Sequence, residues 1–379
     1  MSKNSLLIDV IPLLSQLTGI GRYIYEIAKV LETDDAFDIS YFYGYYSKNL
    51  VKPDNMSELK SLKSFLVRNS VVKKLARKYL ILFSKIFVHR FSLYWVPNFI
   101  PLDGIKADKI VSTVHDFSFY VHPEWHPQER LDYFNTNFYK NIKKSDWIIT
   151  GSEFFKNEII EYLKFDAEKI TVIYHGVDNG LFKRYDKNVL SVTKEKFNLA
   201  DNFLLFVGSI EPRKNLLNTL KAYRLLNDDV KENYPFVLVG FKGWKKNTEI
   251  MQEIEKEKKY VRYLGYLSDE ELAHVYNLAT LFVCPSLYEG FGIPPLEAMA
   301  CGTTTIVSNV ASLSEACGDA TLYINPNDIE DIAAKIKMLL NDENLQKDLT
   351  EKGLERVKQF TWEKSAQAHK KVFEKVLKI

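Results

Sequence analysis

The feature that most constrains this chain is an alternation of short apolar runs with longer amphipathic segments, which occurs twice. In the first series, LLIDVI leads into the helix-type GRYIYEIAKVL, and KIVSTV, DWIIT and KITVIY follow. The second series contains FLLFVGS, PFVLVGF and TLFVCPS, separated by helix-type segments such as LSDEELAHVYNLA. Alternation of this kind is typical of βαβ units on a parallel sheet. We therefore expect an α/β protein with two such sheets.

A polar stretch from about Asp178 to Asp201 separates the two series and has no strong periodicity. The chain has 379 residues, and domains commonly hold about 100–200 residues, so two domains are expected. We predict a first domain in residues 1–180, a second in residues 181–360 and a final helix in residues 361–379. Thr361 is the expected N-cap of that helix, and Ser268 with Glu271 forms a capping-box pattern in LSDEEL.

Composition excludes several classes of protein. The chain is 46% hydrophobic and 26% charged, as is ordinary for a soluble globular protein. No run of about 18 apolar residues is free of charge, so no membrane-spanning helix is predicted. The N-terminal apolar run contains Asp9, which indicates a first strand rather than a signal peptide. Cysteines at 284, 301 and 317 form no metal-binding pattern, and their odd number favours a reducing cytoplasm.

The segment SLYEGFGIPPLEAMACG, residues 286–302, combines a glycine turn with a helix start. Gly290 and Gly292 allow backbone dihedrals that other residues avoid. Pro294 and Pro295 suit the first turn of a helix, and Gly302 suits its end. The pattern therefore predicts a strand, a glycine loop and a short helix in succession.

Two glutamates flank this turn in different settings. We expect Glu289 on the loop that leaves the strand and Glu297 in the first turns of the helix. The loop 290–293 would present backbone N–H groups at a helix N-terminus, a common phosphate site, through Gly290, Phe291, Gly292 and Ile293. Glu297 can accept two hydrogen bonds from a ribose diol. The alternative is a structural role, since a helix dipole stabilises a nearby glutamate by about 0.3–1 kcal/mol.

At these residues the sequence resembles glycosyltransferase family 4, whose hallmark is two glutamates separated by seven residues. The likeness also covers LGYLSDEELAHVYNLATLFVCPSLYEGFG (264–292), VGSIEPRKN (207–215), SEFFKNEI (152–159) and TGIGRY (18–23). It implies the GT-B fold, with two Rossmann-like domains whose parallel sheets face across a cleft and a last helix that crosses back to the first domain. It also implies that the first domain binds the acceptor and the second a nucleotide sugar. Transfer would retain the anomeric configuration and need no metal ion or other cofactor.

The resemblance places Arg213 and Lys214 on the donor diphosphate. Arginine offers a planar fork and lysine a point charge, and both compensate phosphate charge. Cations near a helix N-terminus are disfavoured unless an anion is bound, which favours this role over a solvated pair. Ser209 stands where many family members carry an arginine, so that role passes to Arg213 or is weaker. The motif EPRKN is similar to the corresponding motif of a subgroup rich in mannosyltransferases.

His115, at the end of KIVSTV, matches a family histidine that meets the donor sugar near the reacting carbon. It can donate a hydrogen bond to a sugar hydroxyl or to a backbone carbonyl; a lone histidine at a strand end is otherwise usually structural. The longer VHDFSFYVHPEWHP is similar to members that use GDP-mannose. We expect His122 and His126 to be loop residues, and no spacing indicates a metal site.

Two further donor contacts are implied by the resemblance. Gly19 and Gly21 lie in the predicted first strand-to-helix loop, which approaches the donor phosphates in the family, although G-x-G alone is a weak signal. Tyr266 and Leu267 lie in a loop whose backbone meets the base in related enzymes.

Basic residues gather between Lys60 and Arg90, where no Asp or Glu intervenes and apolar residues recur at helical spacing. Such a segment suits the surface of an anionic membrane. The alternatives are a helix packed on the first domain, or nucleic-acid binding, for which no motif is present. We expect a cytoplasmic protein held peripherally on the inner face of the cytoplasmic membrane, without a nucleic-acid partner.

Together these patterns predict a hexosyltransferase that moves mannose from GDP-mannose to a saccharide acceptor, with a lipid-linked acceptor in O-antigen, capsule or exopolysaccharide synthesis. UDP-glucose, UDP-N-acetylglucosamine and dTDP-rhamnose are alternative donors. A sugar-nucleotide epimerase or a phosphorylase is the alternative enzyme class. A non-catalytic carbohydrate-binding subunit is the alternative outside enzymes, and intact Glu289, Glu297, Lys214 and His115 argue against it.

Overall fold

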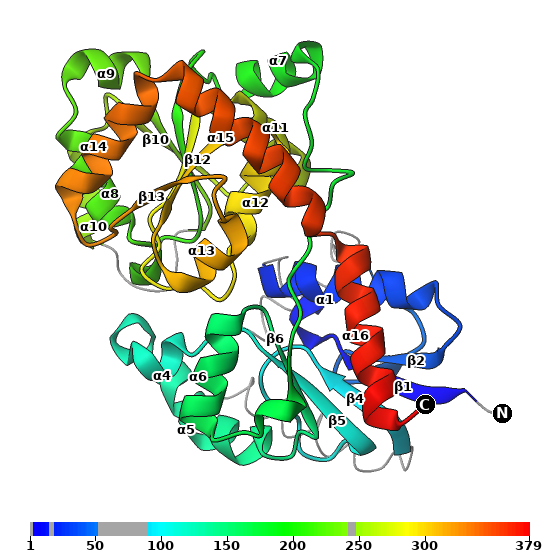
Figure 1. Cartoon of the computed structure of the whole chain (residues 1–379). Helices are drawn as coiled ribbons and strands as arrows, with labels where there is room; N and C mark the ends of the chain where they lie inside the picture. Colours follow the sequence, from blue (N-terminus) through cyan, green and yellow to red (C-terminus); the bar gives the residue numbers. More distant parts are fainter. Residues whose placement is uncertain (1–2, 15–18, 52–89, 242–247) are drawn as a thin grey trace. The chain divides into compact units, whose positions relative to one another are not determined.

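The computed structural model describes residues 3–14, 19–51, 90–241 and 248–379. The chain divides into two compact units, each with its own sheet (Figure 1). The first unit comprises Met1–His115, Asp132–Gly176 and Trp362–Ile379, and the second comprises Asp116–Leu131 and Val177–Thr361. The predicted basic segment between Lys60 and Arg90 lies outside the described residues except for Arg90 itself.

The units differ from the predicted domains in one long segment and, by a few residues, at the boundaries near 177–180 and 361. Residues 1–180 were expected to form one domain, but Asp116–Leu131 clusters with the second unit. The chain passes to the second unit again after Gly176 and returns to the first at Trp362. The predicted polar divider between Asp178 and Asp201 is not irregular throughout, because it contains a helix.

Among the described residues of the first unit, seven strands form a sheet in the order β3-β2-β1-β4-β5-β6-β7, and only β3 of these runs antiparallel to its neighbour. Its strands are β1 (Asn4–Asp9), β2 (Phe37–Phe42), β3 (Tyr46–Ser47), β4 (Arg90–Val96), β5 (Lys106–Val114), β6 (Trp147–Thr150) and β7 (Ile170–Val172). The strand order reverses beside β1, which lies between β2 and β4. In open parallel sheets, ligands bind outside the carboxyl ends of the strands at such a point.

The described residues of the first unit also form helices. They are η1 (Ile11–Leu14), α1 (Gly19–Glu32), α5 (Gln128–Ile142, mostly in this unit), α6 (Glu153–Leu163), η4 (Ala167–Lys169) and α16 (Trp362–Leu377). Gly19 and Gly21 lie in the first turn of α1 and not in the predicted loop, because the helix begins at Gly19. Helix α16 lies along α1 and contacts β4 and β5 (Figure 1).

A chain of buried hydrogen bonds joins α1, α16 and the sheet. His369 Nδ1 lies 2.7 Å from the Ser365 carbonyl, so Nδ1 donates and Nε2 must accept. Tyr23 therefore donates its hydroxyl proton to His369 Nε2 over 2.6 Å. The Tyr23 oxygen then accepts from Thr113 Oγ1 at 2.9 Å, and Thr113 Oγ1 accepts from Trp95 Nε1 at 3.1 Å. Every donor has one acceptor, which sets the tautomer of His369 and stabilises α16 on the first unit.

The second unit contains an all-parallel sheet in the order β10-β9-β8-β11-β12-β13. Its strands are β8 (Leu204–Val207), β9 (Phe236–Val239), β10 (Val261–Gly265), β11 (Leu281–Cys284), β12 (Thr304–Ser308) and β13 (Leu322–Ile324). Its helices are α4 (Ser118–Val121), η3 (Pro123–Trp125), α7 (Lys187–Lys196), η5 (Pro212–Lys214), α8 (Leu216–Arg224), α9 (Asp228–Asn233), α10 (Thr248–Lys256), α11 (Asp269–Leu278), α12 (Ile293–Ala300), α13 (Ala311–Cys317), α14 (Ile329–Leu340), α15 (Glu343–Arg356) and η6 (Val357–Gln359).

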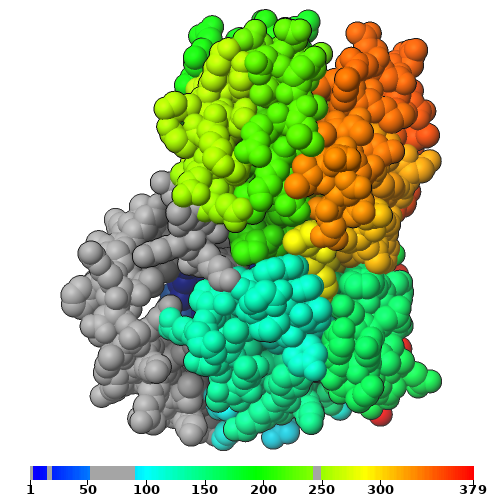
Figure 2. All heavy atoms as spheres, turned by 90° about the vertical axis from the view of Figure 1, so that its left-hand side faces the viewer, coloured from blue at the N-terminus to red at the C-terminus, as the bar shows by residue number. Residues whose placement is uncertain are grey.

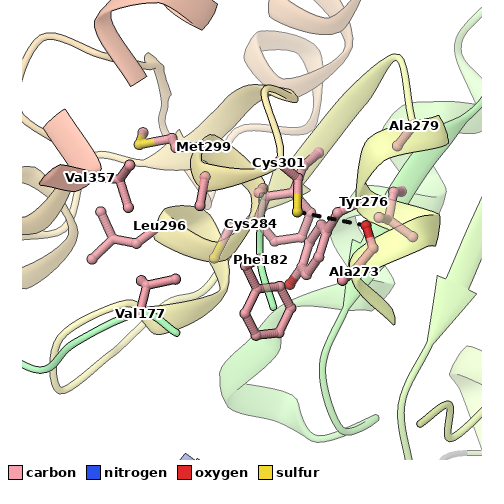
Figure 3. Packing of buried hydrophobic residues seen from close by; sticks show 14 of the residues in the cluster. Val177, Phe182, Ala273, Tyr276, Ala279, Cys284, Leu296, Met299, Cys301 and Val357 are labelled. Carbon is pink, nitrogen blue, oxygen red and sulfur yellow. Dashed lines mark hydrogen bonds between the residues drawn. The ribbon is translucent and has the colours of Figure 1, made fainter. Parts of the chain in front are cut away.

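Both faces of this second sheet are buried, as the continuous apolar runs predict. Successive residues of a strand point to opposite faces, so Leu205 joins one core and Leu204 and Phe206 join the other. The core with Leu205 is closed by α11, α12 and α13 (Figure 3). The other core is closed by α8, α10 and α14, which lie side by side in the space-filling view (Figure 2).

Several local predictions are confirmed. Ser268 and Glu271 form a complete capping box at the start of α11. The proline pair lies in the first turn of α12, and Gly302 follows the helix with φ at 77°. Helix α16 begins at Trp362, directly after Thr361. Among the described residues, no helix has both the length and the apolar character needed to cross a membrane.

Candidate active site

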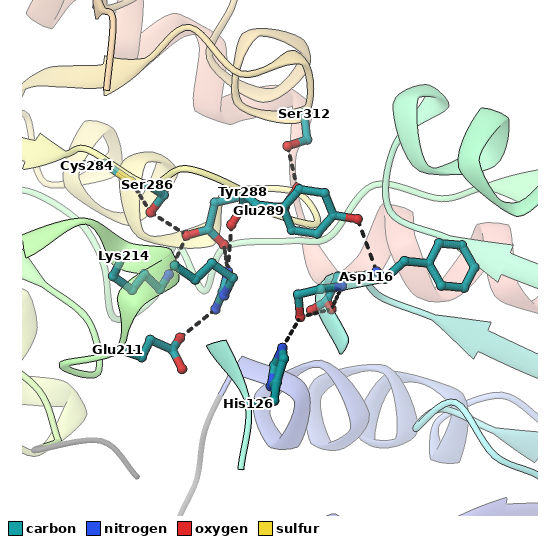
Figure 4. A network of polar contacts seen from close by, with 12 residues as sticks. Asp116, His126, Glu211, Lys214, Cys284, Ser286, Tyr288, Glu289 and Ser312 are labelled. Atoms are coloured by element: carbon teal, nitrogen blue, oxygen red, sulfur yellow. Dashed lines mark hydrogen bonds and ion pairs between the residues drawn. The ribbon is translucent and has the colours of Figure 1, made fainter. Parts of the chain in front are cut away.

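Glu289 lies on the loop between β11 and α12, as predicted. Its side chain is buried, and Ser286 Oγ donates to its Oε1 over 2.7 Å. Its backbone carbonyl accepts a hydrogen bond from Ser312 Oγ at 2.5 Å. These contacts hold both the main chain and the carboxylate of Glu289 in one arrangement (Figure 4).

The two predicted cations converge on this carboxylate from η5 (Figure 4). Lys214 Nζ lies 2.5 Å from Glu289 Oε1, and Arg213 Nη1 lies 2.6 Å from Oε2. The backbones are also joined, because Leu287 N donates to the Arg213 carbonyl at 2.9 Å. The structure thus brings together Glu289, Arg213 and Lys214, which the sequence placed about 75 positions apart.

Arg213 has two more acceptors besides Glu289. Its Nη1 donates to the Tyr288 carbonyl at 3.0 Å, and its Nη2 donates to Glu211 Oε1 at 2.9 Å. A guanidinium has five N–H donors, so Nε–H and one Nη2–H remain without a partner among the described residues. Arg213 keeps 19% of its side chain exposed. It can therefore offer two further donors to a ligand.

The electrostatics of the cluster favour the charged forms. Burial raises the pKa of Glu289, but Arg213 and Lys214 outweigh burial and hold that pKa at about 2. Burial also opposes charge on Arg213, yet Glu289, Glu211 and Asp116 together raise the pKa of its guanidinium. Glu289 is thus an ionised carboxylate at neutral pH. Its Oε1 already has two donors and its Oε2 has one, which leaves a lone pair on Oε2 for a ligand hydroxyl.

The glycine loop that follows Glu289 leads into α12. Gly292 has φ at 111°, and an added Cβ would lie 2.5 Å from Leu313 Cδ2, so glycine is required here. Gly290 is not among the glycines with positive φ, so of the two glycines that allow unusual dihedrals Gly292 is the one that adopts one. Phe291 is buried against Phe360, with ring centroids 5.5 Å apart. Residues 290–293 therefore bring main-chain N–H groups to the N-terminus of α12.

Glu297 lies in α12, as predicted, with a different set of neighbours. Its carboxylate is buried and accepts a hydrogen bond from the Tyr276 hydroxyl at 3.3 Å. Its negative charge also contributes to the raised pKa of the Cys301 thiol, after the larger effect of burial. The two glutamates of the motif thus interact with different partners, which fits two different roles.

His115 belongs to the first unit and ends β5. Its Nε2 lies 2.8 Å from the Pro97 carbonyl, so Nε2 carries the proton and donates. The sequence led us to expect a hydrogen bond from this histidine to a sugar hydroxyl or to a backbone carbonyl, and in the structure its partner is the Pro97 carbonyl. His115 also packs edge-on against Tyr23, with ring centroids 4.9 Å apart. The ring is therefore fixed in orientation.

The other residues predicted to contact the nucleotide sugar are Tyr266, Leu267, Gly19 and Gly21, which lie near the ends of other elements. Tyr266 follows β10, is 41% exposed and stacks on Phe241, with ring centroids 4.6 Å apart. Leu267, by contrast, is buried in the core closed by α11. In the first unit, Gly21 is buried in α1, whereas Gly19 is exposed and has open space around an added Cβ.

The segment Asp116–Leu131 contributes contacts that the sequence did not predict, and His126, expected only as a loop residue, takes part in one of them. Phe117 N donates to the hydroxyl of Tyr288 at 3.2 Å, and the carbonyl of the same tyrosine accepts from Arg213. Ser118 Oγ donates to Asp116 Oδ1 at 2.6 Å, so His126 Nε2, 3.0 Å from Ser118 Oγ, must donate (Figure 4). Burial, helped by the nearby arginines, lowers the pKa of His126 to about 4 and keeps it neutral.

Sequence reasoning also missed Glu211, Tyr288, Ser286 and Ser312. All four contact Glu289 or Arg213 directly. Glu211 lies in EPRKN, and Ser286 and Tyr288 lie in SLYEGFGIPPLEAMACG, both of which were quoted, so closeness in sequence to a predicted residue was an available signal. Ser312 comes from α13, and nothing in the local pattern indicates its contact.

Comparisons with known proteins show which family the chain belongs to. Residues 17–180 match the family model described as Glycosyltransferase Family 4, and residues 191–356 match the one described as Glycosyl transferases group 1. The O-antigen chain mannosyltransferase B of Escherichia coli is 34% identical over 368 residues, covering 93% of this chain and 94% of that protein. The serotype-specific mannosyltransferase WbdA of Escherichia coli is 32% identical over 274 residues, covering 70% of this chain but 33% of that protein.

A solved structure shows the fold. The crystal structure of Anabaena Alr3699/HepE in complex with UDP and glucose aligns with a TM-score of 0.71 at 17% identity, covering 98% of this chain and 100% of that one. The two α/β units of this chain and the matched family models define it as a glycosyltransferase with the GT-B fold. The chain belongs to glycosyltransferase family 4, as the sequence resemblance predicted.

Proposed function

We propose that this enzyme transfers mannose from GDP-mannose to a saccharide acceptor, with retention of the anomeric configuration, during synthesis of a surface polysaccharide. The observation that carries the proposal is the pair of cations held on Glu289 with N–H donors to spare, beside the amide loop 290–293. The choice of mannose is supported by the mannosyltransferase names of the two Escherichia coli relatives. A nucleoside diphosphate ligand is supported by the UDP named in the Anabaena structure.

The donor diphosphate would lie on Arg213, Lys214 and the main-chain N–H groups of residues 290–293. As the bond from the anomeric carbon to the phosphate oxygen breaks, negative charge grows on the leaving phosphate. Fixed cations and amide dipoles stabilise that charge without reorganising, an effect often worth about 10²–10³ in rate for one donor. The protein supplies this charge through its own side chains, so we propose that the reaction needs no bound metal ion.

The two glutamates would contact different parts of the donor. Glu289 has one free lone pair on Oε2 for a hydroxyl of the sugar. Glu297 would accept from the ribose diol, with Tyr276 orienting its carboxylate. We retain for His115, Gly19 and Gly21 the donor contacts that the family resemblance implies, and for Tyr266 and Leu267 the contact with the base. His115 would act as an oriented imidazole, since its Nε2–H donates to the Pro97 carbonyl.

The acceptor and the location belong to the same proposal. The acceptor would be a saccharide carried on a lipid, bound by the first domain. The basic segment between Lys60 and Arg90 would attach the enzyme peripherally to the cytoplasmic face of an anionic membrane. These assignments rest on the sequence pattern and on the O-antigen role named for the first relative.

A donor screen tests the proposal. Purified enzyme is incubated with GDP-mannose, UDP-glucose, UDP-N-acetylglucosamine and dTDP-rhamnose, each with and without mannosylated lipid-linked acceptors and with EDTA present. Of the four donors, we expect only GDP-mannose to release its nucleoside diphosphate, and only when an acceptor is present. NMR of the product should show an α linkage. Preference for another donor would overturn the mannose assignment, and product release without any acceptor would favour an epimerase or hydrolase.

Variants of the cations test the site itself. Lys214→Ala and Arg213→Ala should each lower the transfer rate by about a hundredfold or more while circular dichroism stays unchanged. Lys258→Ala, which removes an exposed cation paired with Glu255, is the matched control. Near-normal turnover in both site variants would remove the assignment of the diphosphate to Arg213 and Lys214.

A further inference from the structure

Arg213 is anchored at two nitrogens, and one of these anchors has no role in the function proposed above. Nη1 contacts Glu289 and the Tyr288 carbonyl, whereas Nη2 contacts Glu211 Oε1 at 2.9 Å. Glu211 is the residue directly before η5, and its side chain is 5% exposed. It is therefore a buried carboxylate whose one hydrogen bond in the described structure is to Arg213.

The second oxygen of Glu211 strengthens this point. Oε2 is buried and has no hydrogen-bond partner among the described residues. Buried carboxylate oxygens normally have partners, as Glu289 does on both of its oxygens. A carboxylate retained at such a cost needs a compensating interaction, and the ion pair with Arg213 is the one that the structure provides.

The geometry explains what this ion pair does. Two contacts hold the guanidinium at Nη1, which is one of its three nitrogens. The contact at Nη2 adds a second, separate point of attachment and so restrains the position of the remaining Nε–H and Nη2–H. Two N–H donors of one guanidinium match two oxygens of a phosphate, which a single lysine cannot do. In the segment VGSIEPRKN, Arg213 and Lys214 are the two cations, so Arg213 is the one residue there that can provide such a fork.

We infer that Glu211 is a positioning residue that orients Arg213 so that its free N–H pair receives the donor diphosphate. This inference rests on the proposed function, in which Arg213 contacts that diphosphate. Glu211 does not touch the donor, and it acts only through the guanidinium. Its loss should therefore weaken ligands that carry a diphosphate and leave the bare nucleoside unaffected.

A double-mutant cycle tests the inference. Binding of GDP and of guanosine is measured by calorimetry for the wild type, Glu211→Ala, Arg213→Ala and the double variant, with UDP and uridine in parallel. We expect Glu211→Ala to weaken GDP about tenfold or more, because an aligned charge-assisted contact is lost. Guanosine should change less than about twofold, because it carries no phosphate charge. In the Arg213→Ala background, the further effect of Glu211→Ala on GDP should vanish.

A conservative variant keeps the test valid if Glu211→Ala folds poorly. Glu211→Gln retains an acceptor oxygen for Arg213 Nη2 and should recover most of the GDP affinity. Glu253→Ala is the matched control, because it removes another buried glutamate that pairs with an arginine, Arg224 at 2.7 Å, in the same unit. It should lower thermal stability without changing the ratio of GDP to guanosine affinity.

The outcomes separate the inference from the proposed function. Unchanged GDP binding in Arg213→Ala, or no binding of GDP or UDP by the wild type, would remove the proposed diphosphate site. Lost GDP binding in Arg213→Ala, with Glu211→Ala behaving like Glu253→Ala, would leave that site intact and overturn the role of Glu211. Equal weakening of GDP and guanosine by Glu211→Ala, or additive effects in the double variant, would also overturn it.

Discussion

Lys214 Nζ lies 2.5 Å from Glu289 Oε1, and Arg213 forms an ion pair with the other oxygen of the same buried carboxylate. A carboxylate removed from water would ordinarily tend to take up a proton. Here two cations on opposite oxygens keep it ionised and hold its pKa at about 2. The same contacts fix the positions of both cations before any ligand binds, which is the preorganisation that stabilises charge in a transition state.

Replacing Glu289 by Gln should lower both stability and activity, with a definite pH dependence. The folded pKa of about 2 lies below the ordinary value of 4.5, so the folded state favours the ionised form. This contribution is complete above pH 4.5 and is lost as pH falls towards 2; a shift of this size corresponds to roughly 3 kcal/mol. Urea unfolding of both proteins from pH 7 down to the lowest pH at which both fold measures it. The stability difference between wild type and variant should shrink as pH falls, and a constant difference would contradict the assigned pKa.

Replacing Tyr288 by Phe should lower turnover more than stability. The substitution removes the hydroxyl that accepts from Phe117 N at 3.2 Å and keeps the carbonyl that holds Arg213. We expect a loss of about 1 kcal/mol in stability and a several-fold fall in kcat, because the Asp116–Ser118 turn loses its tie to the loop beside Glu289. Steady-state kinetics and urea unfolding together measure the two effects.

Tyr323→Phe is the control for this prediction. Its hydroxyl donates to the Gly318 carbonyl at 2.6 Å in the same unit, away from the ion pairs of Glu289. It should show a similar loss of stability with normal kcat. Equal kinetics in Tyr288→Phe and wild type would mean that the Phe117 contact is structural only.

Replacing Gly292 by Ala should destabilise the second unit. The residue has φ at 111°, and the new Cβ would lie 2.5 Å from Leu313 Cδ2. Backbone strain of this kind costs about 1–3 kcal/mol, and the clash adds to it. Leu313 is fully buried and its own loss destabilises the core, so the comparison is made in a Leu313→Ala background, where Gly292→Ala should cost only the backbone strain. No further loss of stability in that background, measured by urea unfolding, would show that the dihedral carries no strain.

Gly19→Ala separates a ligand role from a structural one. Gly19 lies at the start of α1 with nothing within 4 Å of an added Cβ. Alanine should therefore stabilise the helix by up to about 1 kcal/mol. If the backbone of Gly19 approaches the donor phosphates, as the family resemblance implies, KM for the donor should rise although the protein becomes more stable. An unchanged KM would remove Gly19 from the donor site.

Replacing His369 by Gln should remove part of the acid sensitivity of the first unit. Burial, with a smaller effect of the nearby His115, lowers the pKa of His369 to about 4 from an ordinary 6.5. Because the unfolded chain binds the proton more readily, the wild type loses stability as pH falls from 6.5 through 4, by roughly 3 kcal/mol. Protonation would also force Nε2 to donate towards Tyr23, which already donates to it.

Glutamine keeps an acceptor for Tyr23 and does not titrate. The stability of His369→Gln should therefore fall less steeply between pH 6.5 and 4 than that of the wild type. His175 remains in both proteins, and its pKa is lowered mainly by burial, with smaller effects of His115 and His369, so most of its own acid sensitivity is common to the two curves. Parallel stability curves for the two proteins would contradict the buried neutral state of His369.

Much of the fold could be predicted because its signals are local. Short apolar runs predicted strands such as β8, β9 and β11. The proline pair predicted the start of α12, and Gly302 predicted where that helix ends. The start of α1 was misplaced, because Gly19 and Gly21 resemble a loop but are helical in the first turn. Intrinsic helix propensity is a weak guide where tertiary contacts hold a terminus, and glycine is tolerated there.

The segment Asp116–Leu131 marks a different limit. It follows β5 of the first sheet without interruption, so chain order suggests the first domain. Its contacts, such as Phe117 with Tyr288, place it instead with the second unit. Such membership depends on pairs 171 positions apart, which local pattern does not encode.

The sequence by itself determined the two α/β sheets, the family and the position of the EGFG loop, because each depends on residue types at short spacings. Only the tertiary structure decided that Glu289 holds both cations, that Glu211 anchors the far side of Arg213, and that Tyr23 meets His369 across 346 positions. The physical reason is that hydrogen bonds and ion pairs depend on distances of a few ångströms. Those distances exist only once packing has brought remote elements together.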